Sequence, residues 1–377
     1  MCMRKTVLVD LNDLQNISQI EETKNKISAA GENVGNIVWY QTVKRRLVYD
    51  KEIGILSTYS ETGDTYVIPM ANNINMRSWQ FVKISDNWAK GSNQIIILGL
   101  GAQLTQELNT PKKLVNALPK EIKRAIQSIS LYTNDFEVRG NMTAECLELL
   151  GVHNYKVLGC PSFYYSPTNM LNICDLELSE ISNLALSFDH YGNEKTRNFF
   201  EMCFYSQYWK KAKWVMQTMR DMPLTMEGLK VEERHLQNRF PGTSVEAEMF
   251  FNNVRQKGVI FFDFDEWGAF FKKENIDLSV GMRFHGNMIA LLNGIPALWI
   301  THDDRTEELC DVIGLPHVDI KKITVATCLD EIIERVNYDI NYRNKYISCL
   351  KEYMVFLNNN HITYRWDEIE ERQISGI

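Results

Sequence analysis

The chain has 377 residues, which is too long for one ordinary core and predicts two domains of comparable size. Hydrophobic residues make up 45% and charged residues 24%, a balance that excludes a disordered or fibrous protein. The formal net charge is −7, so the composition argues against a broad basic face that would bind a nucleic-acid backbone.

No uninterrupted apolar run approaches the roughly 20 residues that a transmembrane helix needs. The apolar stretch at 6–10 is short and ends in an aspartate, which indicates a buried strand and not a signal peptide. The 8 cysteines are scattered, with no C-x-x-C pair, so neither a zinc site nor a disulfide framework is indicated. A reduced protein can bury such cysteines as small hydrophobes, and we therefore expect a cytoplasmic protein.

Short apolar runs alternate with amphipathic stretches along the chain, the pattern of parallel sheets flanked by helices. In chain order, strands are predicted at 6–10, 54–58, 65–69, 95–99, 128–133, 155–158, 184–188, 258–263, 277–280 and 297–301. Helices are predicted at 120–127, 142–150, 195–212, 265–273 and 285–293, and loops at 221–250. Gly151 and Gly294 follow helices at positions that favour a left-handed residue.

The pattern is interrupted near 165–182, where a domain boundary is expected. We predict an N-terminal Rossmann-like domain over 1–175, a C-terminal Rossmann-like domain over 176–340 and a helical tail over 341–377. In the tail, the apolar residues are spaced to cover one face of a helix: Tyr346, Leu350, Tyr353, Met354 and Leu357.

The most informative segment is 277–316, whose periodicity predicts strand, turn, helix, strand, turn and helix. The first helix begins near His285 or Gly286 after the short strand at 277–280. The second follows the strand at 297–301. Asp304 and Glu307 form a plausible capping box for this second helix.

Charged side chains follow both of these strands. Arg283 and His285 come after the first strand, and His302, Asp303 and Arg305 come after the second. Ligands of open α/β sheets bind beyond the carboxyl ends of the strands, where helix N-termini also point. We therefore expect a single anion site for a phosphate or carboxylate group, which a guanidinium can bind in a bidentate manner.

Two simpler interpretations remain open. Arginines near helix ends are common on protein surfaces, and a histidine is often only a hydrogen-bonded structural residue, so a non-catalytic anion-binding protein is one alternative. His302, Asp303 and Asp304 could instead hold a metal ion. This is disfavoured, because the adjacent Arg305 repels a cation and Asp304 is expected to cap a helix.

The same residues carry a family resemblance. The motif Gly281-x-Arg283-x-His285-Gly286, followed by Ala290-Leu291 and Gly294-x-Pro296, resembles the signature of polysaccharide pyruvyl transferases, and His302-Asp303-x-Arg305-Thr306-x-Glu308-Leu309 is similar to one branch of that family. Further pieces fit in the expected order: Gly31-Glu32-Asn33-Val34-Gly35-Asn36, then 95–101, 138–143 and 157–162. The resemblance spans about residues 31–316.

The resemblance implies a GT-B-like α/β architecture, in which two Rossmann-like domains with parallel sheets face each other across a cleft. It implies transfer of a pyruvyl group from phosphoenolpyruvate to a sugar of a polysaccharide, such as a capsule or an exopolysaccharide, or of a glycan precursor. The product is a pyruvate ketal, and phosphate is released. No cofactor or metal is expected, with phosphoenolpyruvate as the donor substrate. The acceptor would be a sugar, a glycan or a lipid-linked saccharide, and a lipid-linked one would bring the protein to the inner face of the membrane.

The resemblance also implies roles for single residues. His285 matches the proposed general acid that protonates the methylene carbon of the donor. Arg283 matches the arginine that holds the anionic groups of the donor, and Arg139 matches a second arginine from the first domain. The remaining expected substrate contacts are Arg305, His302, Asn33, Gly35, Asn36 and Gly286.

The chain departs from the family pattern at one position. The early motif commonly ends in Gly-Asp, whereas here it ends in Gly35-Asn36. If the aspartate deprotonates an acceptor hydroxyl, Asn36 can orient that hydroxyl but cannot take its proton. Asp303 and Glu308 are speculative substitutes for the missing base.

Arginines and a helix N-terminus should both favour the neutral form of His285. We therefore expect that binding of the anionic donor brings a proton onto this imidazole. The rival enzyme class on the same architecture is a glycosyltransferase that uses a nucleotide sugar. In that case Asp263 or Asp265 could bind the ribose.

Overall fold

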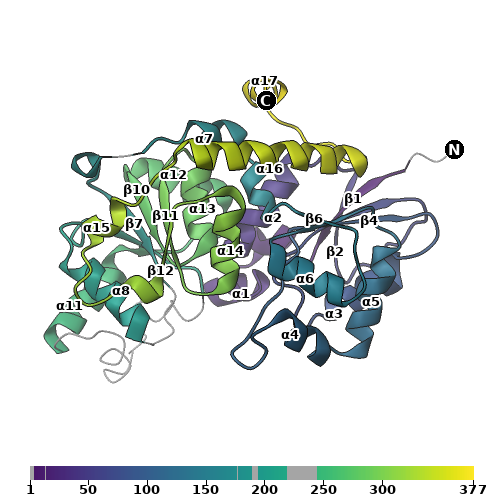
Figure 1. Ribbon diagram of the computed structural model, residues 1–377, viewed down its shortest axis with the longest axis horizontal. Coiled ribbons are helices and arrows are strands. Elements are labelled where there is room, and N and C mark those ends of the chain that lie inside the picture. Colours follow the sequence, from purple (N-terminus) through teal and green to yellow (C-terminus); the bar gives the residue numbers. More distant parts are fainter. Residues whose placement is uncertain (1–3, 13, 176, 189–193, 219–243) are drawn as a thin grey trace.

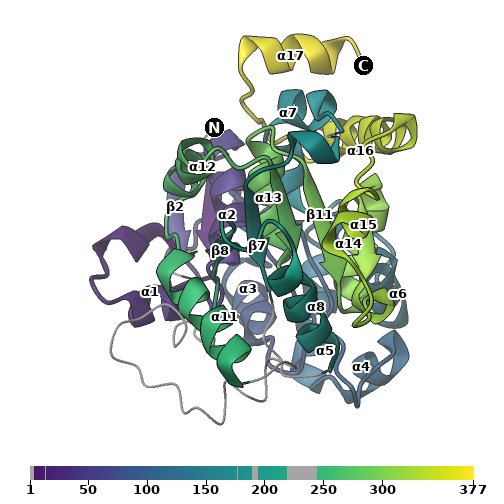
Figure 2. The same ribbon diagram turned by 90° about the vertical axis from the view of Figure 1, so that its left-hand side faces the viewer.

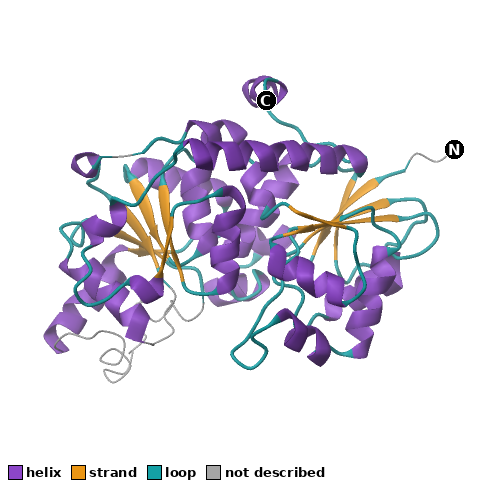
Figure 3. Ribbon diagram, viewed as in Figure 1, coloured by secondary structure: helices purple, strands orange, loops and turns teal. Residues whose placement is uncertain are grey.

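The computed structural model describes residues 4–12, 14–175, 177–188, 194–218 and 244–377. Two parallel sheets form the two halves of the molecule, and helices cover both faces of each sheet (Figure 3). We refer to the first sheet and its helices as the N-terminal half, and to the second sheet and its helices as the C-terminal half.

The N-terminal sheet contains β1 (Thr6–Asp10), β2 (Lys51–Gly54), β3 (Thr65–Pro69) and β4 (Gln94–Leu98), in the order β2-β1-β3-β4. All neighbouring strands are parallel. A parallel pair, β5 (Phe136–Val138) and β6 (Tyr155–Val157), extends the sheet beyond β4 through a bridge between Leu100 and Val138. The strand order reverses direction between β1 and β3, so the topological switch point lies there.

The C-terminal sheet is also fully parallel. It contains β7 (Leu184–Ser187), β8 (Lys213–Val215), β9 (Gly258–Val259), β10 (Leu278–Gly281), β11 (Ala297–Thr301) and β12 (His317–Asp319). Their order, β12-β11-β10-β7-β8-β9, is that of a dinucleotide-binding sheet, and its switch point lies between β7 and β10.

The N-terminal helices are α1 (Thr23–Ala29), α2 (Gly35–Arg46), α3 (Trp79–Trp88), α4 (Pro111–Ala117), α5 (Lys120–Ser130), α6 (Asn141–Leu149) and α7 (Pro167–Asn172). The second part of the chain adds α8 (Glu194–Tyr205), α11 (Ser244–Lys257), α12 (Phe264–Lys273), α13 (Phe284–Leu292), α14 (Asp304–Ile313), α15 (Leu329–Ile333), α16 (Ile340–Asn359) and α17 (Glu368–Ser375). Short 3-10 helices lie at Leu14–Gln19, Pro161–Tyr164, Leu178–Glu180 and Ile320–Lys322.

One apolar cluster joins the two halves. It contains Leu8 of β1, Trp39 of α2, Met288 of α13 and Tyr353 of α16, all almost completely buried. Helix α13 is buried on every side, which fits the apolar run from Met288 to Leu292. One further apolar cluster lies on the outer face of each sheet. The halves therefore share a core and are not connected by a linker alone.

Helix α16 runs along both halves of the molecule (Figure 1). Its tyrosine hydroxyls donate hydrogen bonds to the backbone, from Tyr342 to Met170 O and from Tyr346 to Phe163 O, each at 2.9 Å. Leu350 and Leu357 are buried on the same face, which confirms the apolar face predicted for the tail. Helix α17 stands out from the body next to α7 (Figure 2).

Several predicted elements are confirmed, among them β1, β3 and β11 with their bounds, and α12 and α13 to within one residue. Gly151 and Gly294 have φ values of 75° and 78°, the left-handed conformation expected after a helix. The predicted domain boundary lies between β6 and β7, but the domain limits themselves stay a prediction.

Other predicted elements are wrong. The first half of the strand expected at 128–133 belongs to α5, which ends at Ser130, because Ile122, Ile126 and Ile129 are spaced to bury one helical face. The strand expected at 54–58 lies earlier, at β2. The strand expected at 258–263 is limited to β9, the helix expected at 195–212 ends at Tyr205, and β8 and β12 were missed. Of the loops expected at 221–250, residues 244–250 belong to α11. The part at 221–243 lies outside the described residues.

Candidate active site

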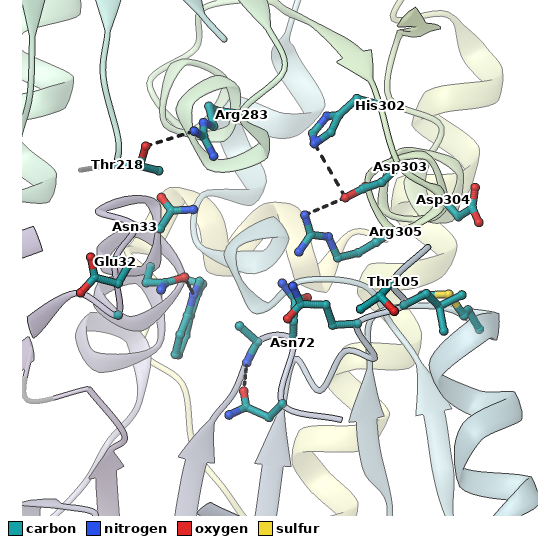
Figure 4. A pocket seen from close by; sticks show the side chains of 18 of the residues that line it. Glu32, Asn33, Asn72, Thr105, Thr218, Arg283, His302, Asp303, Asp304 and Arg305 are labelled. Atoms are coloured by element: carbon teal, nitrogen blue, oxygen red, sulfur yellow. Dashed lines mark hydrogen bonds and ion pairs between the residues drawn. The ribbon is translucent and has the colours of Figure 1, made fainter. Parts of the chain in front are cut away.

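The switch points of both sheets open on one pocket of about 740 Å³, which we call the outer pocket. It is lined by Asn12 and Asn72 from the N-terminal half and by Arg283 and Arg305 from the C-terminal half (Figure 4). A smaller inner pocket of about 70 Å³ shares Asn72, Arg283 and Arg305 with it and also contacts Arg139. The structure therefore brings the two strand ends predicted from the sequence together.

The loop between β10 and α13 is fixed by the buried side chain of Asn287. Its amide nitrogen donates to Gly281 O at 3.2 Å and to Leu298 O at 2.9 Å, and its oxygen accepts from Ser279 Oγ at 2.9 Å. These bonds connect the start of α13 to both β10 and β11. They hold Arg283, the N-cap residue of α13, at the rim of the pocket.

Arg283 lines both pockets and contacts the C-terminal switch point. Its Nε donates to Phe188 O at 3.2 Å, and its Nη2 donates to Thr218 Oγ1 at 3.3 Å. Phe188 directly follows β7, so the guanidinium spans the gap between β7 and β10. This is the position at which doubly wound sheets bind anionic ligands.

His285 lies deeper, in the inner pocket, and is buried. Its Nε2 lies 3.4 Å from Cys160 Sγ. Burial, followed by the charges of Arg139 and Arg305, holds the pKa of His285 well below its usual value of 6.5. The effect expected of neighbouring arginines is present, but burial is the larger cause of the low pKa. These surroundings therefore favour the neutral form of the imidazole.

Arg139 reaches the inner pocket from the opposite half. Its Nε donates to Gly99 O at 2.8 Å and its Nη2 to Met70 O at 3.4 Å, so the guanidinium binds the carboxyl ends of β3 and β4. Burial lowers the pKa of this guanidinium. Glu137, two residues earlier, is fully buried, and burial raises the pKa of its carboxyl well above the usual value.

The loop after β11 contains a connected group of charges. Asp303 Oδ2 accepts from Arg305 Nη2 at 2.9 Å and lies 3.7 Å from His302 Nε2. Asp303, and not Asp304, caps α14 by accepting from Thr306 N at 2.8 Å, which corrects the predicted capping box. Burial acts to raise the pKa of Asp303, but Arg305, His302 and Thr306 outweigh it and lower the pKa to about 2. A carboxylate this acidic is a poor base.

Asn33 and Asn36 line both pockets. The amide of Asn36 is already used within its own half, because Nδ2 donates to Ala30 O at 2.8 Å and Oδ1 accepts from Trp39 Nε1 at 3.1 Å. Asn36 therefore fixes the loop before α2. As an amide, it also cannot take a proton from a substrate hydroxyl.

Gly35 and Gly286 line neither pocket; they enclose the side chain of Gln217. A Cβ on Gly35 would lie 2.7 Å from Gln217 Oε1, and a Cβ on Gly286 would clash with Gln217 Nε2. The backbone of Val34 also donates to Gln217 O at 2.8 Å. Gly35 thus permits close packing between the two halves, and Gly286 makes room for Gln217 within the C-terminal half. The sequence did not predict a role for Gln217, because a single glutamine belongs to no recognisable motif.

Glu308 does not reach the outer or inner pocket. Its Oε1 accepts from Met142 N at 2.5 Å, so it caps α6 across the boundary between the halves, and it excludes any side chain at Gly140. This placement removes Glu308 as a substitute base.

The two carboxylates considered for a ribose lie outside the site. Asp263 caps α12 by accepting from the backbone N of Asp265 and Glu266. Asp265 binds Arg45 of α2 through two bonds of 2.7 and 2.8 Å. Neither residue lines the outer or inner pocket. The rival nucleotide-sugar function therefore loses both of its candidate ribose ligands.

Three general findings apply to the described residues. None of their helices combines the length and apolar character that crossing a bilayer requires. Their seven cysteines are free thiols. No group of three or more His, Cys, Asp and Glu side chains gathers in the described part of the chain as a metal site would require.

Two doubly wound parallel sheets that face a shared pocket define a GT-B-like α/β architecture, as predicted. The sequence model of the family described as polysaccharide pyruvyl transferase matches residues 33–304, and the chain belongs to this family. The match includes Asn33 and Arg139 of the N-terminal half and Arg283 and His285 of the C-terminal half.

Similar solved structures share little sequence with the chain. A putative UDP-N-acetylglucosamine 2-epimerase from Listeria monocytogenes has 9% identity and a TM-score of 0.45, with 91% of each chain covered. The UDP-GlcNAc 2-epimerase from Methanocaldococcus jannaschii has 9% identity and a TM-score of 0.42, with 94% of this chain and 100% of that chain covered. A functionally uncharacterised protein of Klebsiella pneumoniae has 13% identity and a TM-score of 0.38, with 74% and 84% covered. No curated protein matches the chain.

Proposed function

We propose that the protein transfers a pyruvyl group from phosphoenolpyruvate to a sugar of a polysaccharide or glycan precursor, with release of phosphate. One observation carries this proposal beyond family membership: Arg139, Arg283 and Arg305 surround the same small inner pocket that holds His285. Three fixed positive charges next to a buried imidazole suit a donor that is both an anion and a proton acceptor.

The charges of the donor match this pocket. Phosphoenolpyruvate carries a carboxylate and a phosphate, and guanidinium groups bind both through paired hydrogen bonds. With the arginines neutralised by the donor, the electrostatic cause of the low pKa of His285 is offset. The donor therefore brings a proton onto the imidazole, which then acts as the general acid.

The reaction balances with the groups present. His285 gives a proton to the methylene carbon, and one acceptor hydroxyl forms a C–O bond to the neighbouring carbon. A second hydroxyl of the same sugar forms the other C–O bond as the bond to phosphate breaks. Of the two hydroxyl protons, one restores His285 and the other leaves on inorganic phosphate. The arginines stabilise the developing negative charge, so the proposal requires no metal ion.

The outer pocket is the proposed acceptor site, because it is larger than the inner pocket and continuous with it through Asn72 and Arg283. It can admit the end of a free glycan or of a lipid-linked saccharide. We place the reaction in the cytoplasm, at the membrane face if the acceptor is lipid-linked.

Two substitutions test the roles of the donor residues. We expect His285→Ala to retain stabilisation by phosphoenolpyruvate and to lose about 100-fold or more in turnover. Arg283→Ala should instead weaken donor binding by about 10-fold or more, because it removes a charge-assisted bond. The readouts are thermal shift and phosphate release. Arg124→Ala, on the exposed face of α5, is the matched control. Near-normal turnover of His285→Ala would disprove the acid role.

Ligand binding separates this function from its rival. Phosphoenolpyruvate should raise the unfolding temperature, and uridine diphosphate should not. Calorimetry in buffers of different ionisation enthalpy should reveal proton uptake with the donor. Stabilisation by the nucleotide alone would instead support a glycosyltransferase.

A further inference from the structure

Asn72 holds a position in the site that the sequence did not predict. It follows β3 at the switch point of the N-terminal sheet, and it lines both the outer and the inner pocket. Figure 4 shows it across the pocket from Arg283 and His302. It is therefore placed where the proposed donor and acceptor sites meet.

The side-chain amide of Asn72 has no hydrogen bond to any described residue, and its Oδ1 is buried. Burying an amide oxygen without a partner is unfavourable, so such groups are rare in folded proteins. The neighbouring amides differ. Both the nitrogen and the oxygen of the Asn36 side-chain amide form hydrogen bonds within the protein. Asn33 Oδ1 accepts from Gly35 N at 2.9 Å.

The backbone around this amide is nevertheless well fixed. Asn72 O accepts from Asn75 Nδ2 at 2.7 Å, and the neighbouring Ala71 N donates to Asn73 Oδ1 at 2.8 Å. Gly101 N also donates to Ala71 O at 2.6 Å. Since rotation about the last side-chain torsion of asparagine is soft, the oxygen can turn towards the pocket without breaking any protein bond.

The opposite wall contributes hydrogen-bond donors. The guanidiniums of Arg283 and Arg305 can donate but cannot accept. Of the acidic side chains on this wall, Asp303 is engaged by Arg305 and by the cap of α14. An acceptor hydroxyl entering the junction therefore needs an oxygen to receive its hydrogen, and Asn72 can offer one that the protein does not use.

We infer that Asn72 positions the attacking hydroxyl of the acceptor by accepting its hydrogen bond, a role that rests on the proposed pyruvyl transfer. An amide orients the hydroxyl but does not remove its proton, which fits a chain with Asn36 at the end of its early motif. The wall beside Asn72 suits a neutral sugar ring, since amide side chains line it that both donate and accept: Asn12, Gln103, Gln106 and Asn109.

The test uses Asn72→Ala in the full-length protein and measures the acceptor KM, the donor KM and kcat separately. We expect kcat/KM for the acceptor to fall by about 10-fold or more, because a bond to the attacking group is lost, while the donor KM stays unchanged. The unfolding temperature should equal or exceed that of the unchanged protein, because a buried oxygen without a partner is removed. A merely structural role would lower it.

Two further variants sharpen the result. Asn72→Asp keeps the oxygen and adds a negative charge, so it should retain the acceptor KM and raise the donor KM by opposing the anion. Asn116→Ala, at an exposed position of α4 outside both pockets, is the matched control and should change neither constant. A rise in the donor KM alone for Asn72→Ala, or no change in any constant, would overturn the inference. Failure of the proposed function would give a different result from failure of this inference. The unchanged protein would then release no phosphate from phosphoenolpyruvate with any sugar.

Discussion

The chemistry of His285 depends on what is buried around it. Its imidazole contacts Cys160 and lies near Arg139 and Arg305, all within a small pocket. A positive charge is unfavourable there until an anion arrives. Burial, together with the arginines that would bind phosphoenolpyruvate, therefore disfavours the protonated imidazole, and an arriving anion opposes the effect of the arginines. This couples proton uptake to donor binding.

This environment predicts a pH dependence of stability. The folded-state pKa of His285 lies below the unfolded value of 6.5, so the unfolded chain binds the extra proton as the pH falls past 6.5. Between about pH 7.5 and about pH 5.5, the unchanged protein should lose roughly 1 kcal/mol more stability than His285→Gln. Urea denaturation at both pH values measures this. The buried Glu137 acts in the opposite direction, but it is present in both proteins and cancels. Equal losses would contradict the prediction.

At the level of single residues, the sequence predicts those that follow strand ends and misses those defined by packing. Arg283 and His285 were found because their location relative to a strand can be inferred from periodicity. Asn287, Gln217 and Asn72 are isolated amides, and only the folded chain shows what they contact.

Among the secondary-structure elements, helix α14 contacts the N-terminal half through a helix cap. Glu308 extends from α14 to the backbone of Met142 at the start of α6, next to the space left by Gly140. A carboxylate at a helix N-terminus satisfies a free N–H group and interacts favourably with the helix dipole. The contact holds α6, and with it the neighbouring Arg139, against the C-terminal half.

We therefore expect Glu308→Ala to lower the free energy of unfolding by about 1–2 kcal/mol. Glu307→Ala, at an exposed position of the same helix, should change it by less than about 0.5 kcal/mol. Equilibrium denaturation measures both. Equal effects of the two substitutions would show that the cap does not contribute.

Helices and strands could be predicted from the sequence where the spacing of the apolar residues showed one clear period. The buried strands β3 and β11 are uninterrupted apolar runs between turn residues, and their bounds followed from the sequence. The short strands β8 and β12 have three residues each, too few to show a period. The error at 128–133 arose because Ser128, Ile129, Ser130 and Leu131 alternate between polar and apolar, as in a half-buried strand.

For the molecule as a whole, the shared core determines how the halves behave. Sequence patterns indicated two Rossmann-like units, but they could not show that α2, α13 and α16 pack into one apolar cluster between them. Domains that share a large apolar interface do not move freely relative to each other. The outer pocket is therefore largely formed before any ligand binds.

The shared core predicts cooperative unfolding. Calorimetry should show a single transition whose calorimetric and van't Hoff enthalpies agree, although the chain is longer than most proteins that unfold in this way. Phosphoenolpyruvate should shift the whole transition upward, because residues of both halves line the proposed donor pocket. Two separate transitions, only one of them sensitive to the donor, would contradict this.

The position of α16 also has a consequence for biosynthesis. This helix follows both sheets in the chain, yet its tyrosines pack in the core between them, with Tyr353 stacked on Tyr164 at 3.8 Å between ring centroids. While the ribosome is still translating the C-terminal sheet, that apolar surface is uncovered. The inner pocket can therefore reach its final geometry only after the segment at 340–359 has left the exit tunnel, and until then the nascent chain exposes an apolar surface that favours aggregation.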